Sequence, residues 1–174
     1  MNAPTPAAPL RKAIECGVPD NKPHLHPTLL KNYGNWKYHD RPRPGVLHHV
    51  SHSGDEIWTV RAGTQRQMDL YTIRKLCDIA DQFAEGHVRF TIRSNIEYIV
   101  STEAQVAPLI AELEKNGFPV GGTGNSVSMV SHTQGWLHCD IPGTDASGVV
   151  KSMMDELYNE FKTEEMPNRV HMST

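Results

Sequence analysis

Several features that define whole classes of proteins are missing from this sequence of 174 residues. Its three cysteines, Cys16, Cys77 and Cys139, lie far apart without paired spacing, which excludes the disulfide framework of a small secreted protein. No apolar run approaches the ~20 residues that cross a bilayer. The start of the chain is rich in proline and alanine and lacks the apolar segment of a signal peptide. We therefore expect a cytoplasmic protein with no membrane span.

The chain also lacks an excess of positive charge. Its formal net charge is −3, which argues against a nucleic-acid binder. A hydrophobic content of 38% and a charged content of 21% are ordinary for a globular protein. Basic residues nevertheless gather in one stretch, which includes Arg61, Arg66, Arg74, Lys75, Arg89 and Arg93. This local concentration suits a small anionic ligand better than a polyanion.

Proline divides the chain into an irregular and a regular part. Prolines recur through residues 1–44 and forbid long helices and central strands, so this part is predicted to be an N-terminal arm. Regular patterning begins at Gly45, and residues 45–118 are predicted to form a compact domain. Residues 119–174 follow as a further unit, with a loop region up to residue 143.

The order of elements predicts the fold class. The patterns indicate strands at 46–50, 57–62, 88–93 and 96–100, helices at 69–84, from the Thr102–Gln105 capping box to Gly117 and at 144–162, and a strand starting at 169. Strand, strand, helix, strand, strand, helix predicts an α+β fold, in which an antiparallel sheet carries helices on one face. Cys77 falls on the apolar stripe of its helix and is predicted to lie in the core.

Arginines at strand positions form the first candidate site. Arg61 ends one predicted strand, and Arg89, Thr91 and Arg93 share one face of another because side chains alternate. Fixed guanidinium groups beside a hydroxyl suit a carboxylate or an oxyanion. A solvated strand face with scattered salt bridges is the alternative, and spacing alone favours it.

Two further motifs are weaker signals. The loop Gly121-Gly-Thr-Gly-Asn125 offers backbone N–H groups to an anion, but it lacks the lysine of a phosphate-binding loop, so a plain loop is the alternative. His132, His138 and Cys139 are good ligand types for iron or zinc, yet they are too few for a structural metal site. On chemistry alone Cys139 is a small buried residue.

Together these stretches resemble the beta subunits of dissimilatory sulfite reductases. The resemblance runs from about Tyr33 to the last residue, and the stretches around Tyr33 and Gly63 are closer to the subunits of sulfur-oxidising bacteria. The matching motifs are Arg41-Pro-Arg-Pro-Gly-Val-Leu, Thr59-Val-Arg-Ala-Gly-Thr-Gln-Arg66, Val88-Arg-Phe-Thr-Ile-Arg-Ser-Asn-Ile-Glu97, Gly121-Gly-Thr-Gly-Asn125, His132-Thr-Gln-Gly-Trp-Leu-His-Cys139 and Thr144-Asp-Ala-Ser-Gly-Val-Val-Lys151.

The resemblance implies a ferredoxin-like sulfite/nitrite reductase half-domain over residues 45–118. Residues 119–174 would be the truncated start of a domain that binds siroheme and a [4Fe-4S] cluster. It further implies a complex of two alpha and two beta subunits that interconverts sulfite and sulfide at the siroheme, in the oxidative direction in the cell. The alpha subunit and a small sulfur-carrier protein are the implied partners.

The resemblance also assigns roles to residues. Arg61 is implied to be catalytic, facing the siroheme and its bound anion, and Cys139 to be the first cysteine ligand of the cluster. Siroheme contacts are implied for Arg61, Arg66, Arg89, Thr91, Arg93, Gly122, Thr123, His132 and Gln134.

In the family the remaining cluster cysteines follow after the point that corresponds to Thr174, so we expect the fragment alone to be inactive. Two alternatives stay open. A non-catalytic binding module would carry exposed aromatic side chains on its sheet. An inactive gene fragment is the other alternative.

Overall fold

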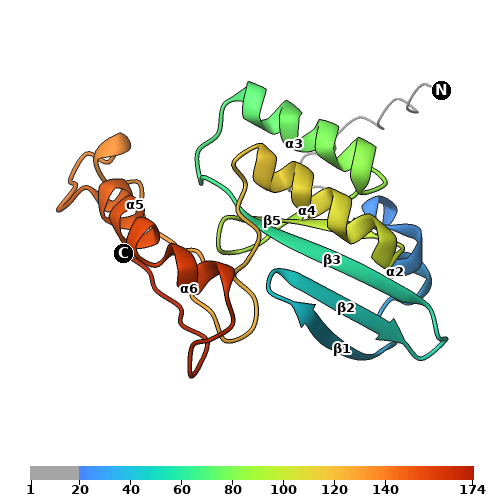
Figure 1. The fold of residues 1–174 in the computed structure, drawn as a ribbon. Helices are drawn as coiled ribbons and strands as arrows, with labels where there is room; N and C mark the ends of the chain where they lie inside the picture. The colour runs from blue at the N-terminus through green and yellow to red at the C-terminus, as the bar shows by residue number, and fades with distance from the viewer. Residues whose placement is uncertain (1–19) are drawn as a thin grey trace.

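A five-stranded antiparallel sheet is the centre of the computed structural model, which describes residues 20–174 (Figure 1). Its spatial order is β1-β2-β3-β5-β4. Two helices, α3 and α4, cover one face of this sheet (Figure 1), which confirms the predicted α+β fold. The short helices η1 (Lys22–His24) and α2 (Pro27–Lys31) precede the sheet. The strands and the two covering helices are β1 (Trp36–Arg43), β2 (Val46–Ser51), β3 (Glu56–Gly63), α3 (Leu70–Phe83), β4 (Val88–Phe90), β5 (Asn95–Val100) and α4 (Val106–Lys115).

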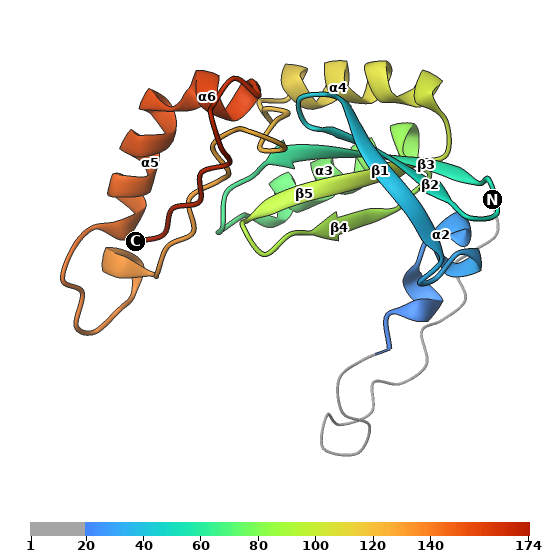
Figure 2. The same cartoon turned by 90° about the horizontal axis from the view of Figure 1, so that it is seen from below.

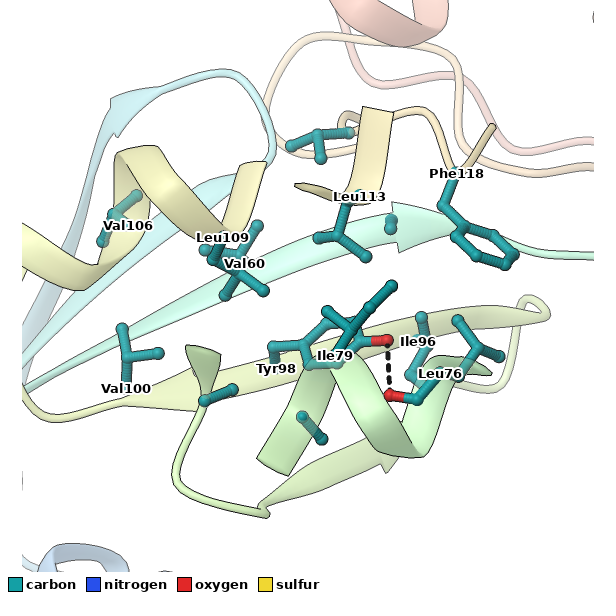
Figure 3. Packing of buried hydrophobic residues seen from close by; sticks show 14 of the residues in the cluster. Val60, Leu76, Ile79, Ile96, Tyr98, Val100, Val106, Leu109, Leu113 and Phe118 are labelled. Carbon is teal, nitrogen blue, oxygen red and sulfur yellow. Dashed lines mark hydrogen bonds between the residues drawn. The ribbon is translucent and has the colours of Figure 1, made fainter. Parts of the chain in front are cut away.

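The hydrophobic core lies between the sheet and these two helices (Figure 3). Its fully or nearly fully buried members include Val60, Leu76, Ile79, Ile96, Tyr98, Val100, Val106, Leu109 and Leu113. Tyr98 donates its hydroxyl to Leu76 O at 3.2 Å, so its polar atom is satisfied inside the core. The prediction for Cys77 is wrong, because the buried stripe of α3 runs through Leu76, Ile79 and Ala80 and leaves Cys77 exposed.

Local signals at the helix ends are confirmed. Asp69 caps α3 by accepting a hydrogen bond from Thr72 N at 2.7 Å. The capping box of Thr102 and Gln105 precedes α4, and Gly117, with φ +81°, follows its end. Within residues 20–174 no helix is long and apolar enough to cross a membrane.

The sheet begins earlier in the chain than the proline content predicted. β1 lies inside the stretch assigned to the arm and pairs antiparallel with β2, with His39 opposite His49. Pro42 is tolerated there because β1 is an edge strand and its register shifts between Asp40 and Arg43. Residues 1–19, which include Cys16, lie outside the described part of the chain.

β4 ends at Phe90, not at Arg93 as predicted. The next residues form a turn, in which Thr91 Oγ1 accepts a hydrogen bond from Asn95 N at 3.1 Å and Ser94 has φ +55°. The alternation that placed Thr91 and Arg93 beside Arg89 therefore does not hold, because the chain leaves the sheet at Thr91.

Residues after α4 form a lobe beside one end of the sheet (Figure 2). A single helix was predicted over 144–162, but the helix breaks at Leu157 into α5 (Ala146–Glu156) and α6 (Tyr158–Lys162). The 3-10 turn η3 (Gly135–Leu137) interrupts the preceding loop. Two parallel bridges, Val127 with Val170 and Ser131 with Ser173, then hold the final segment beside that loop.

Phe161 joins this lobe to the sheet. Its ring is fully buried, and Gly122 N donates to its carbonyl oxygen at 2.8 Å. A Cβ atom at Gly122 would lie 2.7 Å from Phe161 Cε2, and one at Gly63 would lie 3.2 Å from Phe161 Cζ. Glycine at these two positions therefore permits the close approach between the lobe and β3.

The core makes a first prediction about stability. Leu113→Ala should lower the free energy of unfolding by ~2–5 kcal/mol, because it leaves a cavity under α4. Ile92 is 96% exposed in the turn after β4, so the control Ile92→Ala should change that free energy by less than ~0.5 kcal/mol. Urea unfolding followed by circular dichroism measures both. Equal effects would contradict the assigned core.

Candidate anion-binding site

Three charged side chains form a row across β3, β5 and β4. Glu97 on β5 stands opposite Arg61 on β3 and Arg89 on β4 in the strand register. Successive side chains of a strand alternate between faces, and Ile96 and Tyr98 point into the core. The row therefore lies on the sheet face that points away from α3 and α4, which we call the arginine face.

Glu97 holds both guanidinium groups of this row. Its Oε1 accepts from Arg61 Nε at 2.8 Å and its Oε2 accepts from Arg89 Nε at 2.8 Å. The Nη2 group of each arginine donates to the same oxygen as its Nε. The Glu97 side chain is 0% exposed, whereas that of Arg61 is 13% and that of Arg89 is 63% exposed.

The pKa of Glu97 reflects two opposed effects. Burial raises this pKa because it disfavours the charged carboxylate. The positive charges of Arg61 and Arg89, and their hydrogen bonds, outweigh burial and leave the pKa below its ordinary value. Glu97 is therefore ionised at neutral pH, and two guanidinium groups face one carboxylate.

The glycine loop contacts this row through a carbonyl oxygen. Gly122 O accepts from Arg61 Nη1 at 3.1 Å and from Arg169 Nη2 at 3.1 Å. Two of the loop's own N–H groups are used within the protein, since Gly121 N donates to Arg61 O and Gly122 N to Phe161 O. The loop therefore positions arginines, and those two N–H groups are already bonded.

Thr123 fixes the same loop to its surroundings. Its Oγ1 accepts from Gly45 N at 2.7 Å and donates to Glu164 Oε1 at 2.7 Å. Glu164 also lies 3.9 Å from the Nε of Arg41 on β1. Thr123 thereby connects the loop, the β1–β2 turn and the segment after α6.

Arg93 and Arg169 add positive charge from outside the sheet. Arg93 Nη1 donates to Met172 O at 3.4 Å. Within residues 20–174 neither arginine forms an ion pair. Arg169 shares the acceptor Gly122 O with Arg61, and burial, followed by the charges of Arg61, Arg93 and Arg41, lowers the pKa of Arg169.

Sequence reasoning did not single out Arg169 or Glu97 as site residues. Arg169 stands in a short final segment whose position depends on the bridges to residues 127–131. Glu97 gave one usable signal, because a carboxylate in a mostly apolar strand, Asn95–Val100, needs partners when that strand is buried. Arg41 was part of a motif, but its distance from the other arginines was not visible in the spacing.

Arg66, His132 and Gln134 lie at a different place from the row. They line a cleft of about 1440 Å³ that lies between the C-terminal lobe and the wall formed by the end of β3, the loop to α3 and the adjacent ends of α3 and α4. Arg66 Nη1 donates to His132 O. Ser131, which lies between the cleft residues Val130 and His132, donates its N to Met172 O, and the same carbonyl accepts from Arg93 Nη1.

Cys139 lies in the loop after η3, half-buried, and its N donates to Gly135 O at 3.1 Å. Across residues 20–174, no three histidine, cysteine, aspartate or glutamate side chains converge as a metal site. Thr133 N donates to Thr174 O at 3.1 Å. The last residue of the chain thus lies beside the segment that leads to Cys139.

The pKa of Glu97 predicts how the fold responds to acid. Its ionised form stabilises the fold above the ordinary glutamate pKa of ~4.3, and this contribution is lost as pH falls through the lower folded-state value. Glu97→Gln should lower the free energy of unfolding by ~3–5 kcal/mol near neutral pH. The gap between variant and wild type should shrink as the pH falls below that ordinary value.

Urea unfolding at a series of pH values measures this gap. The exposed Glu103 of the turn η2 (Glu103–Gln105) provides the control, because Glu103→Gln should leave unfolding nearly unchanged at each pH. A gap for Glu97→Gln that stays constant on acidification would contradict the assigned ion pairs.

Sequence relatives place this geometry in a family. The model of the nitrite/sulfite reductase ferredoxin-like half domain matches residues 49–116. The dissimilatory-type sulfite reductase beta subunits of Archaeoglobus fulgidus and Nitratidesulfovibrio vulgaris are each 47% identical, over 90% and 84% of this chain. The chain spans 45% and 40% of their lengths. The beta subunit of Megalodesulfovibrio gigas is 44% identical over 97% of this chain and 67% of its own length.

Two solved structures share the fold. The match to the crystal structure of dissimilatory sulfite reductase I covers 90% of this chain and 41% of the chain in that structure, with a TM-score of 0.74 and 15% identity. The NirA protein of Mycobacterium tuberculosis matches 67% of this chain and 22% of its own, with a TM-score of 0.57 and 13% identity. Such identities show the fold alone, whereas the curated relatives show the family. The chain belongs to the beta subunits of dissimilatory-type sulfite reductases.

Proposed function

We propose that this chain is part of a subunit that binds siroheme at its arginine face and, with an alpha subunit, interconverts sulfite and sulfide. The observation that carries the proposal is a surplus of arginine around that face. Two carboxylates, Glu97 and Glu164, stand against five guanidinium groups, those of Arg41, Arg61, Arg89, Arg93 and Arg169.

The chemistry of this set fits a polycarboxylate such as siroheme. A guanidinium group presents a planar fork of N–H donors that matches a carboxylate. Arg93 and Arg169 each donate to a backbone carbonyl and keep further N–H groups for a ligand. Arg89 is the most exposed member of the row. These three arginines would hold the carboxylates.

Arg61 has a different position. It is largely buried, with Nε and Nη2 bound to Glu97 and Nη1 bound to Gly122 O. A charge held so firmly needs no reorganisation when negative charge develops on a bound oxyanion. We therefore propose Arg61 as the residue that faces the reacting anion, while bound siroheme supplies the electron transfer to sulfur.

The remaining residues with implied siroheme contacts support this face. Thr91 holds the turn that carries Arg93. Gly122 and Thr123 hold the loop that orients Arg61 and Arg169. We propose that Arg66, His132 and Gln134, which line the adjoining cleft, contact the edge of the siroheme.

Cys139 is proposed as one ligand of a [4Fe-4S] cluster. Such a cluster needs a full set of cysteine thiolates. The described residues do not make that set, because they contain Cys139 and, on α3, the exposed Cys77. The other ligands would come from the part of the relatives that this chain does not span, so the fragment alone is proposed to be inactive.

A sheet that binds RNA or a protein without a cofactor would present exposed aromatic side chains on its free face. Phe90 is 63% exposed, but it stands opposite Ile96 and so lies on the other side of β4 from Arg89. On its central strands the arginine face carries Thr59, Arg61 and Glu97 beside the buried Ile57 and Ile99, and none of these side chains is aromatic. This composition favours an anionic cofactor.

The resemblance of the stretches around Tyr33 and Gly63 to sulfur oxidisers supports the oxidative direction in the cell. We propose the alpha subunit and a small sulfur-carrier protein as partners, in the cytoplasm. Sulfite and sulfide are the proposed substrate and product pair.

Two arginine substitutions test the proposal in the full-length beta subunit combined with its alpha subunit. Arg93→Ala should reduce the siroheme content, because a carboxylate loses its partner. Arg61→Ala should retain siroheme and lower turnover by ~10²–10³, the usual effect of removing one preorganised charge. Siroheme is measured by absorption after extraction and turnover by sulfite consumption.

Arg74→Ala provides the control, since Arg74 is exposed on α3 on the far side of the sheet. Unchanged siroheme content and turnover in both test variants would contradict the proposal. It would instead support the alternative that these arginines belong to a solvated, salt-bridged strand face.

A further inference from the structure

We infer that Glu97 is a positioning residue for anion binding, acting through the guanidinium groups of Arg61 and Arg89. Glu97 does not reach the ligand in this arrangement, because its carboxylate is fully buried beneath the two arginines. The inference deepens the proposed function and rests on it.

Stability alone does not account for a carboxylate at this place. Glu97 lies in β5, with a strand on each side, between the core residues Ile96 and Tyr98. Removing a carboxylate from water is costly, and a buried ion pair seldom stabilises a fold more than apolar residues of the same volume do. A β-branched apolar residue would suit a buried strand position as well.

The carboxylate fixes the orientation of the two guanidinium groups. Each carboxylate oxygen of Glu97 accepts hydrogen bonds from Nε and Nη2 of one arginine, so this one carboxylate sets the planes of both guanidinium groups. Arg89 gains most from this contact, because its side chain is 63% exposed and Glu97 is its ion-pair partner. An arginine fixed before the ligand arrives loses less conformational entropy on binding.

Charge and position predict opposite effects of changing Glu97. As a negative charge below the arginines, Glu97 opposes the approach of an anion, so its removal would strengthen the attraction. As the group that orients the N–H donors of two guanidinium groups, Glu97 assists binding, so its removal would weaken the binding of siroheme carboxylates. The sign of the effect therefore separates the two roles.

The experiment uses the full-length beta subunit in its complex with the alpha subunit. Glu97→Asp keeps the charge but shortens the side chain, so that one carboxylate no longer reaches both arginines, and Glu97→Gln keeps the length but removes the charge. Siroheme per complex should fall by about tenfold in both, as expected for lost charge-assisted hydrogen bonds. Arg89→Ala should cause a similar fall, and adding Glu97→Asp to it should cause little more.

Two controls separate positioning from stability. Leu113→Ala weakens the core without touching the row, so it should keep its siroheme. Glu103→Gln removes an exposed carboxylate, and this variant should also retain its siroheme. Circular dichroism of each complex reports whether the sheet is retained.

Each outcome decides one point. Equal or higher siroheme content in Glu97→Gln and Glu97→Asp, with siroheme lost in Arg89→Ala, would overturn the positioning role and leave the proposed function standing. Full siroheme in Arg89→Ala would instead count against the arginine face itself. Loss of the sheet signal in both Glu97 variants, or equal siroheme loss in Leu113→Ala, would assign Glu97 to folding alone and overturn the inference.

Discussion

The buried carboxylate of Glu97 is the constraint on which the rest of the arginine face depends. A charge that is 0% exposed must be paired, and here both partners come from the flanking strands. The ion pairs fit only one register of β3, β5 and β4, in which Arg61 and Arg89 stand opposite Glu97. A slip of one residue would turn these side chains into the core. The row thus ties the strand register to the position of the charges.

The two faces of the sheet serve different purposes because side chains alternate. Val60, Ile96 and Tyr98 pack under α3 and α4 and supply the hydrophobic core. The alternate positions carry the charged row, whose arginines need a solvated or ligand-bound side. One short stretch of β5 therefore contributes to folding and to the candidate site at the same time.

The C-terminal lobe completes the cationic set. Phe161 packs onto Gly63 and Gly122, and this contact holds the glycine loop against β3. The carbonyl oxygen of Gly122 then accepts hydrogen bonds from both Arg61 and Arg169. The surplus positive charge consequently depends on a tertiary contact between two parts of the chain. That surplus matches the chemistry of a polycarboxylate cofactor and of a small oxyanion.

Local signals in the sequence determined the elements and the fold class. Asp69, the Thr102–Gln105 capping box and Gly117 act on their own neighbours, so their effect could be read directly. The family motifs likewise identified Arg61 and Arg89 as candidates. Only the tertiary structure decided that Cys77 is exposed, that Trp36–Arg43 joins the sheet and that Arg93 leaves it. It also decided that Glu97, Arg169 and Arg41 belong with the arginines, because burial and charge pairing depend on which distant segments meet, and local periodicity does not encode that.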